Sequence, residues 1–172
     1  MIPFNLKTNE LLVPFDPPHF DAVTSLAVLN DGSLISGSRD KHLRCWDQRA
    51  LTSIQPCQAI MGAHNDWINV LETDNDNRFL YSGCKDGTVK VWKMKNGRQL
   101  KCTASLFYQN NSAAASMGTL STGIGGSGAA SGSSSLSINA ICKIDKQFGQ
   151  TMFATGGNDK TIKIWRYKEP QY

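Results

Sequence analysis

Apolar and polar residues alternate over short segments along most of the chain. In the first part, VTSLAVL at 23–29, SLISGS at 33–38 and HLRCW at 42–46 alternate with a period of two, and the turn formers NDG and SRDK separate them. A period of two places successive side chains on opposite faces of a strand, and helical periodicity is absent. The pattern predicts short antiparallel strands joined by tight turns, and therefore an all-β protein.

Three segments share one outline: ISGSRDKHLRCW at 35–46, LYSGCKDGTVKVW at 80–92 and FATGGNDKTIKIW at 153–165. Aligned on their tryptophans, they carry a hydroxyl ten positions earlier and an aspartate six positions earlier. The shared residues are Ser36, Asp40 and Trp46, then Ser82, Asp86 and Trp92, and finally Thr155, Asp159 and Trp165. Identical spacing predicts a repeated structural unit. Within it, Asp86-Gly87 predicts a tight hairpin turn, because glycine tolerates a positive φ.

The spacing of the tryptophans resembles that of the WD40 repeat. Trp92 follows Trp46 by 46 residues, close to the ~40–45 of a repeat in which four strands form one propeller blade. His19 and His64 precede the alternating segments of the first two units, and Ser134 stands at that position in the third. In WD40 blades a histidine, a hydroxyl residue, an aspartate and a tryptophan form a buried hydrogen-bond network. The resemblance implies a structural role for His19, His64 and the shared residues.

The second interval between tryptophans is longer, 73 residues, because an uncharged segment rich in Ser, Gly and Ala is inserted at 108–135. Such a segment cannot bury enough apolar surface to offset its ordering entropy, so it predicts a disordered surface insertion. The expected organisation is an outer strand and linker from a preceding blade at 1–18, WD40 blades at 19–61 and 62–107, the insertion at 108–135, and a last blade lacking its outer strand at 136–172.

Three blades are too few to close a propeller, since rings typically contain 4–8 blades. We expect an all-β WD40 β-propeller of which this chain forms three blades of a larger, seven-bladed ring, open as given. The remaining blades are expected to come from upstream chain, and completion of the ring by another copy is the alternative. The segment LKTNELLVPF at 6–15 resembles the outer strand of a preceding blade.

Several motifs suggest chemistry that their context does not favour. His64, Ser82 and Asp86 are the residue types of a hydrolase triad, but Ser82 lies in an alternating strand pattern without a G-x-S-x-G context. GIGGSG at 123–128 matches a dinucleotide fingerprint, but no strand precedes it and no helix follows. The five cysteines form no C-x-x-C pair, which favours reduced thiols over disulfides or a zinc site. No catalytic, cofactor or metal residue is predicted.

Composition adds little to this picture. The net charge of +4 is spread along the chain without a long basic run, so no nucleic-acid partner is expected, although an acidic protein surface would suit it. The longest apolar runs are strand-sized and the first ten residues carry no signal sequence, so no membrane association is expected. These observations predict a soluble, cytoplasmic protein.

Residues that the repeat does not hold constant are the candidates for binding. The residue before each turn aspartate is Arg39, Lys85 or Asn158, and on a propeller these side chains project from one rim of the same face. Trp67, which follows His64 at the start of a strand, should lie near them. Tryptophan and arginine are enriched at interface hot spots. The alternative is that Trp67 packs against the neighbouring blade.

The order of features also resembles one family. PPHFDAVTSLAV, SGSRDKHLRCWD, AHNDWINVL and INAICKI followed by FATGGNDKTIKIW look like the final blades of the C-terminal WD40 propeller in kinesin-like motors of the kinesin-4 class. The resemblance implies a non-catalytic interaction scaffold that contacts microtubules, tubulin or partner proteins at the cytoskeleton. No G-x-x-x-x-G-K-[ST] loop is present, so the family's ATPase would lie in an upstream motor domain. The alternative is a WD40 substrate receptor or assembly scaffold, as in a ubiquitin ligase complex.

Overall fold

The computed structural model describes residues 4–5, 7–8, 10–11, 15–47, 56–95, 99–107, 136–147 and 150–167, and all regular structure within them is β-strand. The strands are β1 (Phe4–Asn5), β2 (Glu10–Leu11), β3 (Val23–Val28), β4 (Leu34–Ser38), β5 (Leu43–Trp46), β6 (Pro56–Ile60), β7 (Ile68–Thr73), β8 (Phe79–Cys84), β9 (Thr88–Lys95), β10 (Gln99–Phe107), β11 (Ile138–Gln147), β12 (Gln150–Gly157) and β13 (Ile162–Tyr167). The predicted insertion at 108–135 lies outside the described residues.

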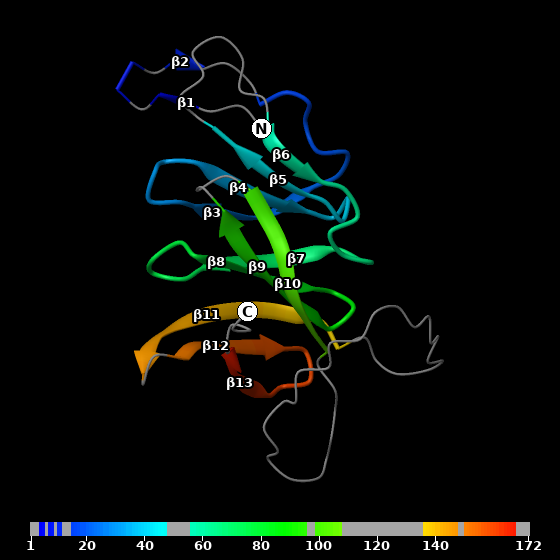
Figure 1. Cartoon of the computed structure of the whole chain (residues 1–172). Helices are drawn as coiled ribbons and strands as arrows, with labels where there is room; N and C mark the ends of the chain where they lie inside the picture. The colour runs from blue at the N-terminus through cyan, green and yellow to red at the C-terminus, as the bar shows by residue number, and fades with distance from the viewer. Residues whose placement is uncertain are drawn as a thin grey trace.

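Three antiparallel sheets contain most of these strands. Their orders are β3-β4-β5-β6, β7-β8-β9-β10 and, in the described residues, β11-β12-β13. We call them the first, middle and third sheets. They stack face to face without closing into a ring (Figure 1). The prediction of an all-β, open, partial propeller is therefore confirmed. The described part of the chain also holds no helix long and apolar enough to cross a membrane.

The turns follow from the repeated aspartate. In the middle sheet, β8 and β9 are joined by a tight turn in which Gly87 has a φ of 84°, which confirms the predicted hairpin. The equivalent positions in the other two sheets are Lys41, with a φ of 71°, and Lys160, with a φ of 64°. A lysine pays a conformational cost in this region that glycine avoids. The aspartate before each of these residues accepts a backbone hydrogen bond two residues on, as Asp86 does from Thr88, and so stabilises the turn.

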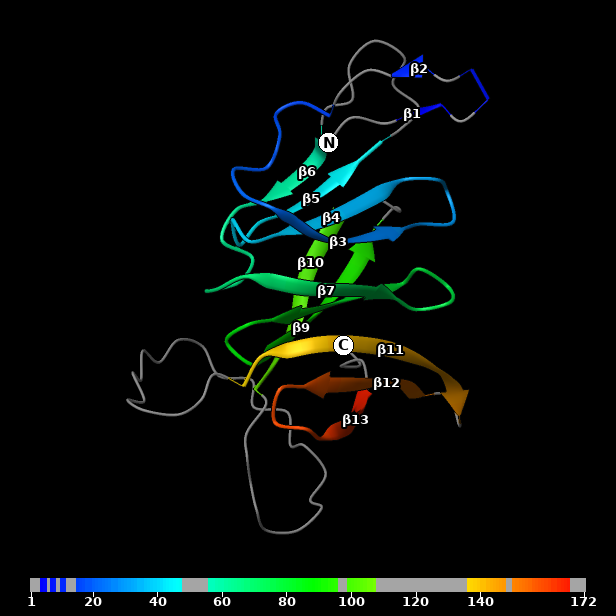
Figure 2. The ribbon, with the colours of Figure 1, turned by 180° about the vertical axis from the view of Figure 1, so that it is seen from behind.

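Two apolar cores hold the sheets together. One lies between the first and middle sheets, and its fully buried members include Ile35, Leu43, Ile68 and Leu80. The other lies between the middle and third sheets, and includes Tyr81, Val89, Val91, Ile138 and Phe153. The middle sheet is thus covered on both faces, as the two opposite views show (Figures 1 and 2).

The start of the chain differs from the expected single outer strand at 6–15. Here β1 and β2 form a short antiparallel hairpin in which Phe4 pairs with Leu11. The side-chain oxygen of Asn5 accepts hydrogen bonds from the backbone N–H groups of Lys7, at 2.9 Å, and Thr8, at 3.4 Å. An asparagine that bonds the backbone two residues on favours a turn, so it interrupts the extended segment there.

Candidate functional site

The first sheet contains a buried chain of four polar side chains. The indole N–H of Trp46 donates to the hydroxyl oxygen of Ser36 at 2.8 Å, and that oxygen lies 2.7 Å from Nε2 of His19. Nδ1 of His19 lies 2.7 Å from Oδ2 of Asp40. Because a carboxylate only accepts hydrogen bonds, Nδ1 carries the proton and Nε2 accepts from Ser36. Every polar group of these four side chains therefore has a hydrogen-bond partner.

The middle sheet contains the same series of hydrogen-bonded side chains, with Thr88 as an additional member. Trp92 donates to Ser82 at 2.8 Å, and the Ser82 hydroxyl lies 2.6 Å from Nε2 of His64. Nδ1 of His64 contacts the hydroxyl of Thr88 at 3.0 Å, and Thr88 donates to Asp86 at 2.6 Å. Thr88 therefore links the histidine to the aspartate. The sequence analysis did not single out Thr88, although a threonine two residues after the aspartate recurs as Thr161 in the third unit.

The third sheet keeps only part of this arrangement. Trp165 donates to the hydroxyl of Thr155 at 2.8 Å. Asp159 accepts a hydrogen bond from the Thr161 hydroxyl at 2.8 Å and lies 3.7 Å from Nζ of Lys163. Ser134, at the position of the histidine, lies outside the described residues. All three sheets therefore share the tryptophan-to-hydroxyl bond and the bond from the turn backbone to the aspartate.

Burial keeps both histidines neutral. Desolvation lowers the pKa of His64 from 6.5 to about 4, and Lys90 adds to the effect while Asp86 opposes it. Desolvation also lowers the pKa of His19, although its hydrogen bond to Asp40 acts in the other direction. Burial alone would raise the pKa of Asp86, but its hydrogen bonds with Thr88 and Cys84 outweigh burial and lower it. Neutral imidazoles and ionised carboxylates are the states that these hydrogen-bond chains require.

The two series of hydrogen-bonded side chains have the connectivity of a hydrolase triad, but a substrate cannot reach their serines. Ser36 and Ser82 are both 0% exposed. In each, the oxygen that would attack a substrate already accepts the indole N–H of a tryptophan. A nucleophilic serine needs an accessible oxygen and an oxyanion hole beside it. The geometry therefore favours a packing role over nucleophilic catalysis.

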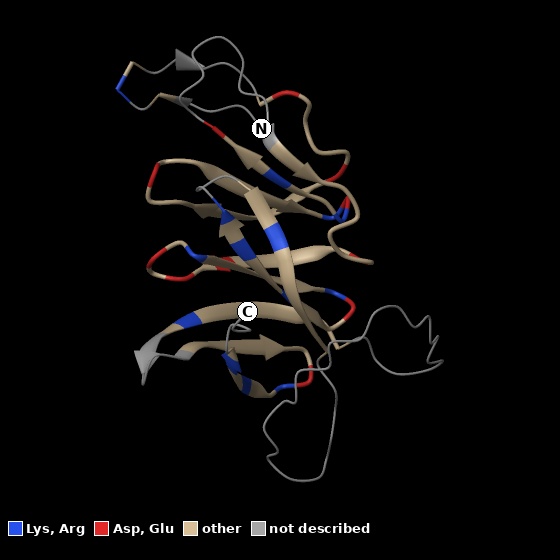
Figure 3. Ribbon diagram, in the orientation of Figure 1, with Lys and Arg blue, Asp and Glu red and all other residues tan. Residues whose placement is uncertain are grey.

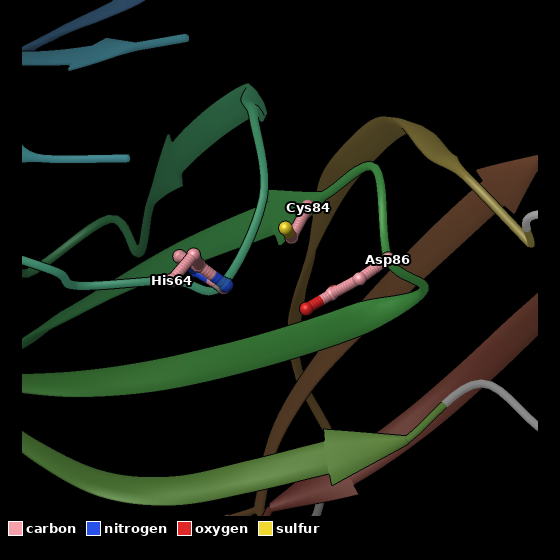
Figure 4. Close-up of side chains that lie close together, drawn as sticks. All are labelled: His64, Cys84 and Asp86. Carbon is pink, nitrogen blue, oxygen red and sulfur yellow. The ribbon is translucent and has the colours of Figure 1, made fainter. Parts of the chain in front are cut away.

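One group of side chains has the composition of a metal site. His64, Cys84 and Asp86 each offer a ligand atom, and these atoms lie within 4.8 Å of one another (Figure 4). Burial raises the pKa of the Cys84 thiol to about 12, whereas metals bind the thiolate. Both ring nitrogens of His64 already have hydroxyl partners. In the first sheet Ser38 stands at the position of Cys84, so the donors fit the repeated hydrogen-bond network better than a metal ion.

The structure brings three of the four candidate binding residues together. Two cations lie over the ring of Trp67, with the Arg39 guanidinium carbon 4.4 Å from the ring centroid and Nζ of Lys85 3.8 Å from it. We call Arg39, Trp67 and Lys85 the Trp67 cluster. Arg39 directly follows β4 of the first sheet, while Trp67 directly precedes β7 and Lys85 directly follows β8 of the middle sheet. Packing of the two sheets therefore assembles the cluster. Such contacts are favourable because the face of an indole ring is electronegative.

The cluster lies on the edge that carries the turns between β4 and β5 and between β8 and β9, at the right in Figure 1 and at the left in Figure 2. Basic and acidic residues lie side by side in the turns at this edge (Figure 3). Asn158 occupies the equivalent turn of the third sheet, where its backbone N–H donates to the carbonyl of Ser137 at 3.1 Å. It therefore shares the rim without joining the cluster.

The same backbone bond identifies the counterparts of Trp67 in the other sheets. The backbone N–H of Lys85 donates to the carbonyl of Trp67 at 2.9 Å, and that of Arg39 donates to the carbonyl of Ala22 at 3.0 Å. Trp67 thus corresponds to Ala22 in the first unit and to Ser137 in the third. Because two sheets fold with small residues at this position, the fold does not require a tryptophan there.

Comparison with known proteins agrees with this architecture. The family profile described as "WD domain, G-beta repeat" matches residues 12–47, 55–93 and 129–166. The chain is 31% identical over 157 residues to "Kinesin-like protein KIF21A" of Homo sapiens, covering 91% of this chain and 7% of that protein. It is 39% identical over 82 residues to "Kinesin-like protein KIF21B" of Homo sapiens, covering 48% of this chain and 5% of that protein.

A third relative is "Nuclear distribution protein nudF" of Aspergillus niger, which is 30% identical over 153 residues, covering 86% of this chain and 30% of that protein. The chain therefore spans less than a third of the length of each of these three relatives. The predicted resemblance to kinesin-like proteins is confirmed by two of them. The three matched repeats, together with the three stacked sheets, show that the chain belongs to the WD-repeat family.

Proposed function

We propose that this chain is a non-catalytic protein-interaction module that binds a partner through the Trp67 cluster. The observation that carries the proposal is a tryptophan in contact with two cations at a position where the other sheets have Ala22 and Ser137. An aromatic residue that the fold does not require, held on an exposed rim, is typical of an interface anchor. Its cations fix the orientation of the ring before a partner arrives.

The chemistry of the rim favours an acidic partner. The nearby carboxylates are turned toward their own turns, since Asp66 accepts from the backbone N–H of Trp67 at 2.8 Å and Asp86 accepts from Thr88. Arg39 is exposed and Lys85 is half-buried, so both cations can reach a second charged group while they contact the ring. Carboxylates of a partner would then pair with these cations, and the indole would bury apolar surface at the centre of the contact.

The relatives suggest where such a partner is found. Two of them are named as kinesin-like proteins. We therefore infer a cytoplasmic, cytoskeleton-associated protein whose partner is tubulin, assembled in microtubules, or a protein bound to them. The module would act by rigid presentation of its rim, since each residue of the cluster lies directly beside the end of a strand in one of two packed sheets.

Co-sedimentation of the chain with microtubules at several salt concentrations tests this function. We expect binding that weakens as salt rises, because charged groups at the rim contribute to it. Trp67→Ala should weaken binding about tenfold or more while the protein stays folded, since Ala22 occupies this position in the first sheet. The matched control is Lys101→Ala, which removes an exposed lysine from the outer strand β10 and should leave binding unchanged.

The result that overturns the tubulin assignment is an absence of co-sedimentation even at low salt. Equal loss of binding in Trp67→Ala and Lys101→Ala would overturn the assignment of the site, because it would show a diffuse charge effect. Thermal melts of both variants verify that each is folded before binding is compared.

A further inference from the structure

A pocket of about 120 Å³ lies between the middle and third sheets, at one edge of the stack. One wall is the turn between β7 and β8, residues 74–76. The other wall consists of Lys143 and Ile144 of β11 and Thr151 and Met152 of β12. This edge is opposite the Trp67 cluster, at the left in Figure 1. The pocket is therefore separate from the site of the proposed function.

Asp74 has a carboxylate oxygen that the turn does not use. The residue is 6% exposed, and its Oδ1 accepts the backbone N–H groups of Arg78 at 2.7 Å and Phe79 at 2.9 Å. Oδ2 is buried and has no hydrogen-bond partner among the described residues. A buried carboxylate oxygen without a partner is costly. The turn therefore accounts for one oxygen of Asp74 and leaves the other without a donor.

The fold does not require an acid at this position. The first strand of each sheet begins at an equivalent point of the register, namely at Val23, Ile68 and Ile138. Six residues later stand Leu29 in the first sheet, Asp74 in the middle sheet and Ile144 in the third. Leu29 is buried in an apolar core. Because two sheets fold with an apolar side chain here, the carboxylate points to a role other than folding.

Size and charge limit what the pocket can hold. A water molecule occupies about 30 Å³ in the liquid, so a pocket of about 120 Å³ admits a few linked heavy atoms. Pockets for whole small-molecule ligands measure about 300–1,000 Å³. The charged residues of the lining are Asp74, Asp76 and Lys143, which leaves one negative charge in surplus. The matching occupant is a singly charged cationic group on a narrow stem.

The single unpaired oxygen favours an ammonium group over a guanidinium. A guanidinium pairs best with both oxygens of a carboxylate, but Oδ1 of Asp74 already accepts two backbone N–H groups. An ammonium is a compact point charge that needs one oxygen at a time. Ile144 and Met152 are half-buried and offer aliphatic surface, and the Thr151 hydroxyl offers a further acceptor. These features match the aliphatic stem and the ammonium of lysine.

We propose that this pocket binds a lysine side chain of a partner protein. The ammonium group donates to Oδ2 of Asp74, and the stem packs on Ile144 and Met152. A free primary amine shares this chemistry, but Asn75 and Asp76 line the pocket and are exposed, so they can also contact the backbone of a peptide. The module would then bind an acidic surface at the Trp67 cluster and a basic segment at the opposite edge.

Titration of the isotope-labelled chain with a capped peptide, acetyl-Gly-Gly-Lys-Gly-Gly-amide, tests the proposal by NMR. We expect saturable shifts of the backbone amides of Asn75 and Asp76 below about 10 mM peptide. The same peptide with norleucine in place of lysine should bind about tenfold more weakly or worse, because it lacks the charge. An arginine peptide and n-butylamine should each bind about threefold more weakly or worse.

Each comparison peptide or amine can overturn one part of the proposal. Equal affinity for the norleucine peptide would overturn the ammonium site, and equal affinity for the arginine peptide would overturn the preference for lysine. Equal affinity for n-butylamine would overturn the assignment to a partner protein and leave a free amine as the ligand.

Asp74→Asn tests the carboxylate itself. Asparagine keeps a carbonyl oxygen for the backbone N–H groups of Arg78 and Phe79 but replaces Oδ2 with a donor, so the lysine peptide should bind about tenfold more weakly or worse. The matched control is Asp31→Asn, which removes the same charge from the exposed turn between β3 and β4 at the same edge (Figure 3). It should change the affinity by less than about twofold, because solvent and salt screen an exposed charge.

A second variant keeps the test independent of how well Asp74→Asn folds. Met152→Lys supplies an ammonium from the chain's own wall of the pocket and should abolish peptide binding. Trp67→Ala should bind the lysine peptide as the wild type does, so a failure of the Trp67 cluster does not affect this site. The proposal is overturned if the wild type shows no saturable shift or if Met152→Lys binds normally. Equal losses in Asp31→Asn and Asp74→Asn would also overturn it.

Discussion

Replacement of Ser82 by alanine tests the structural role of the buried polar chain. Ser82 is 0% exposed, accepts the indole N–H of Trp92 at 2.8 Å and contacts Nε2 of His64 at 2.6 Å. Alanine removes the one oxygen that serves both partners. The indole N–H and the imidazole nitrogen are then left buried without hydrogen bonds, and water cannot reach them without opening the packing between the sheets.

The expected loss of stability follows from the two polar groups that are left without hydrogen bonds, the Trp92 indole N–H and Nε2 of His64. A buried polar group without a partner costs about 1–3 kcal/mol, so the two groups together should reduce the free energy of unfolding of Ser82→Ala by about 2–6 kcal/mol. For a chain of this length, each kcal/mol lowers the melting temperature by roughly 2–4 °C. The melting temperature should therefore fall by roughly 4–24 °C.

Thermal unfolding followed by circular dichroism measures this effect, with Ser33→Ala as the matched control. Ser33 is also buried, but its hydroxyl has no hydrogen-bond partner among the described residues. Removing it leaves no other group unsatisfied, so the control should be neutral or slightly stabilising. The reasoning fails if Ser82→Ala melts with the wild type, or if the two substitutions lower the melting temperature equally.

Two further predictions concern the packing between sheets and its pH dependence. Gly83→Ala should destabilise the protein by about 1–3 kcal/mol, because its β-carbon would overlap Ile138 at 2.6 Å. Gly156→Ala should be neutral, because among the described residues its β-carbon would meet the Ala140 side chain at an ordinary distance of 3.8 Å. Equal denaturant midpoints would contradict this. Because burial lowers the pKa of His64 from 6.5 to about 4, protonation favours the unfolded chain, and stability should fall with decreasing pH between these values by up to about 1.4 kcal/mol per pH unit. The stability difference between wild type and His64→Gln should shrink as the pH falls over this range. A difference that does not change with pH would contradict the lowered pKa of His64.

Local patterns predicted the strands well because each strand is determined by nearby residues. The alternation in VTSLAVL and the glycine of the Asp86-Gly87 turn act over a few positions, and β3 and the β8–β9 turn form where they indicate. The hairpin of β1 and β2 was missed, since the side chain of Asn5 bends a segment whose composition also suits a strand. Short segments of this kind are where a single side-chain hydrogen bond decides between strand and turn.

Sequence reasoning identified only part of the candidate site, because some of its contacts depend on how the sheets pack. The repeat identified Arg39, Lys85 and Asn158 as variable positions of one rim and placed Trp67 near them. The contact between Arg39 and Trp67, however, crosses from one sheet to the next. Such a distance depends on how closely the sheets approach, which no local pattern specifies. Thr88 was missed because its role depends on the position of the His64 ring relative to Asp86.

The close contact between Gly37 of the first sheet and Ile68 of the middle sheet also positions the Trp67 cluster. Ile68, which follows Trp67 in the chain, seats on Gly37, and Gly37 lies two residues before Arg39. The close approach at the glycine therefore fixes the separation of the two strand ends from which Arg39 and Trp67 extend. A larger residue at Gly37 would force the sheets apart directly beneath the cation–π contact, whose strength falls as the cation leaves the ring. Stability and the proposed binding thus share one structural cause, since the glycine that lets the sheets pack also holds the Trp67 cluster in place.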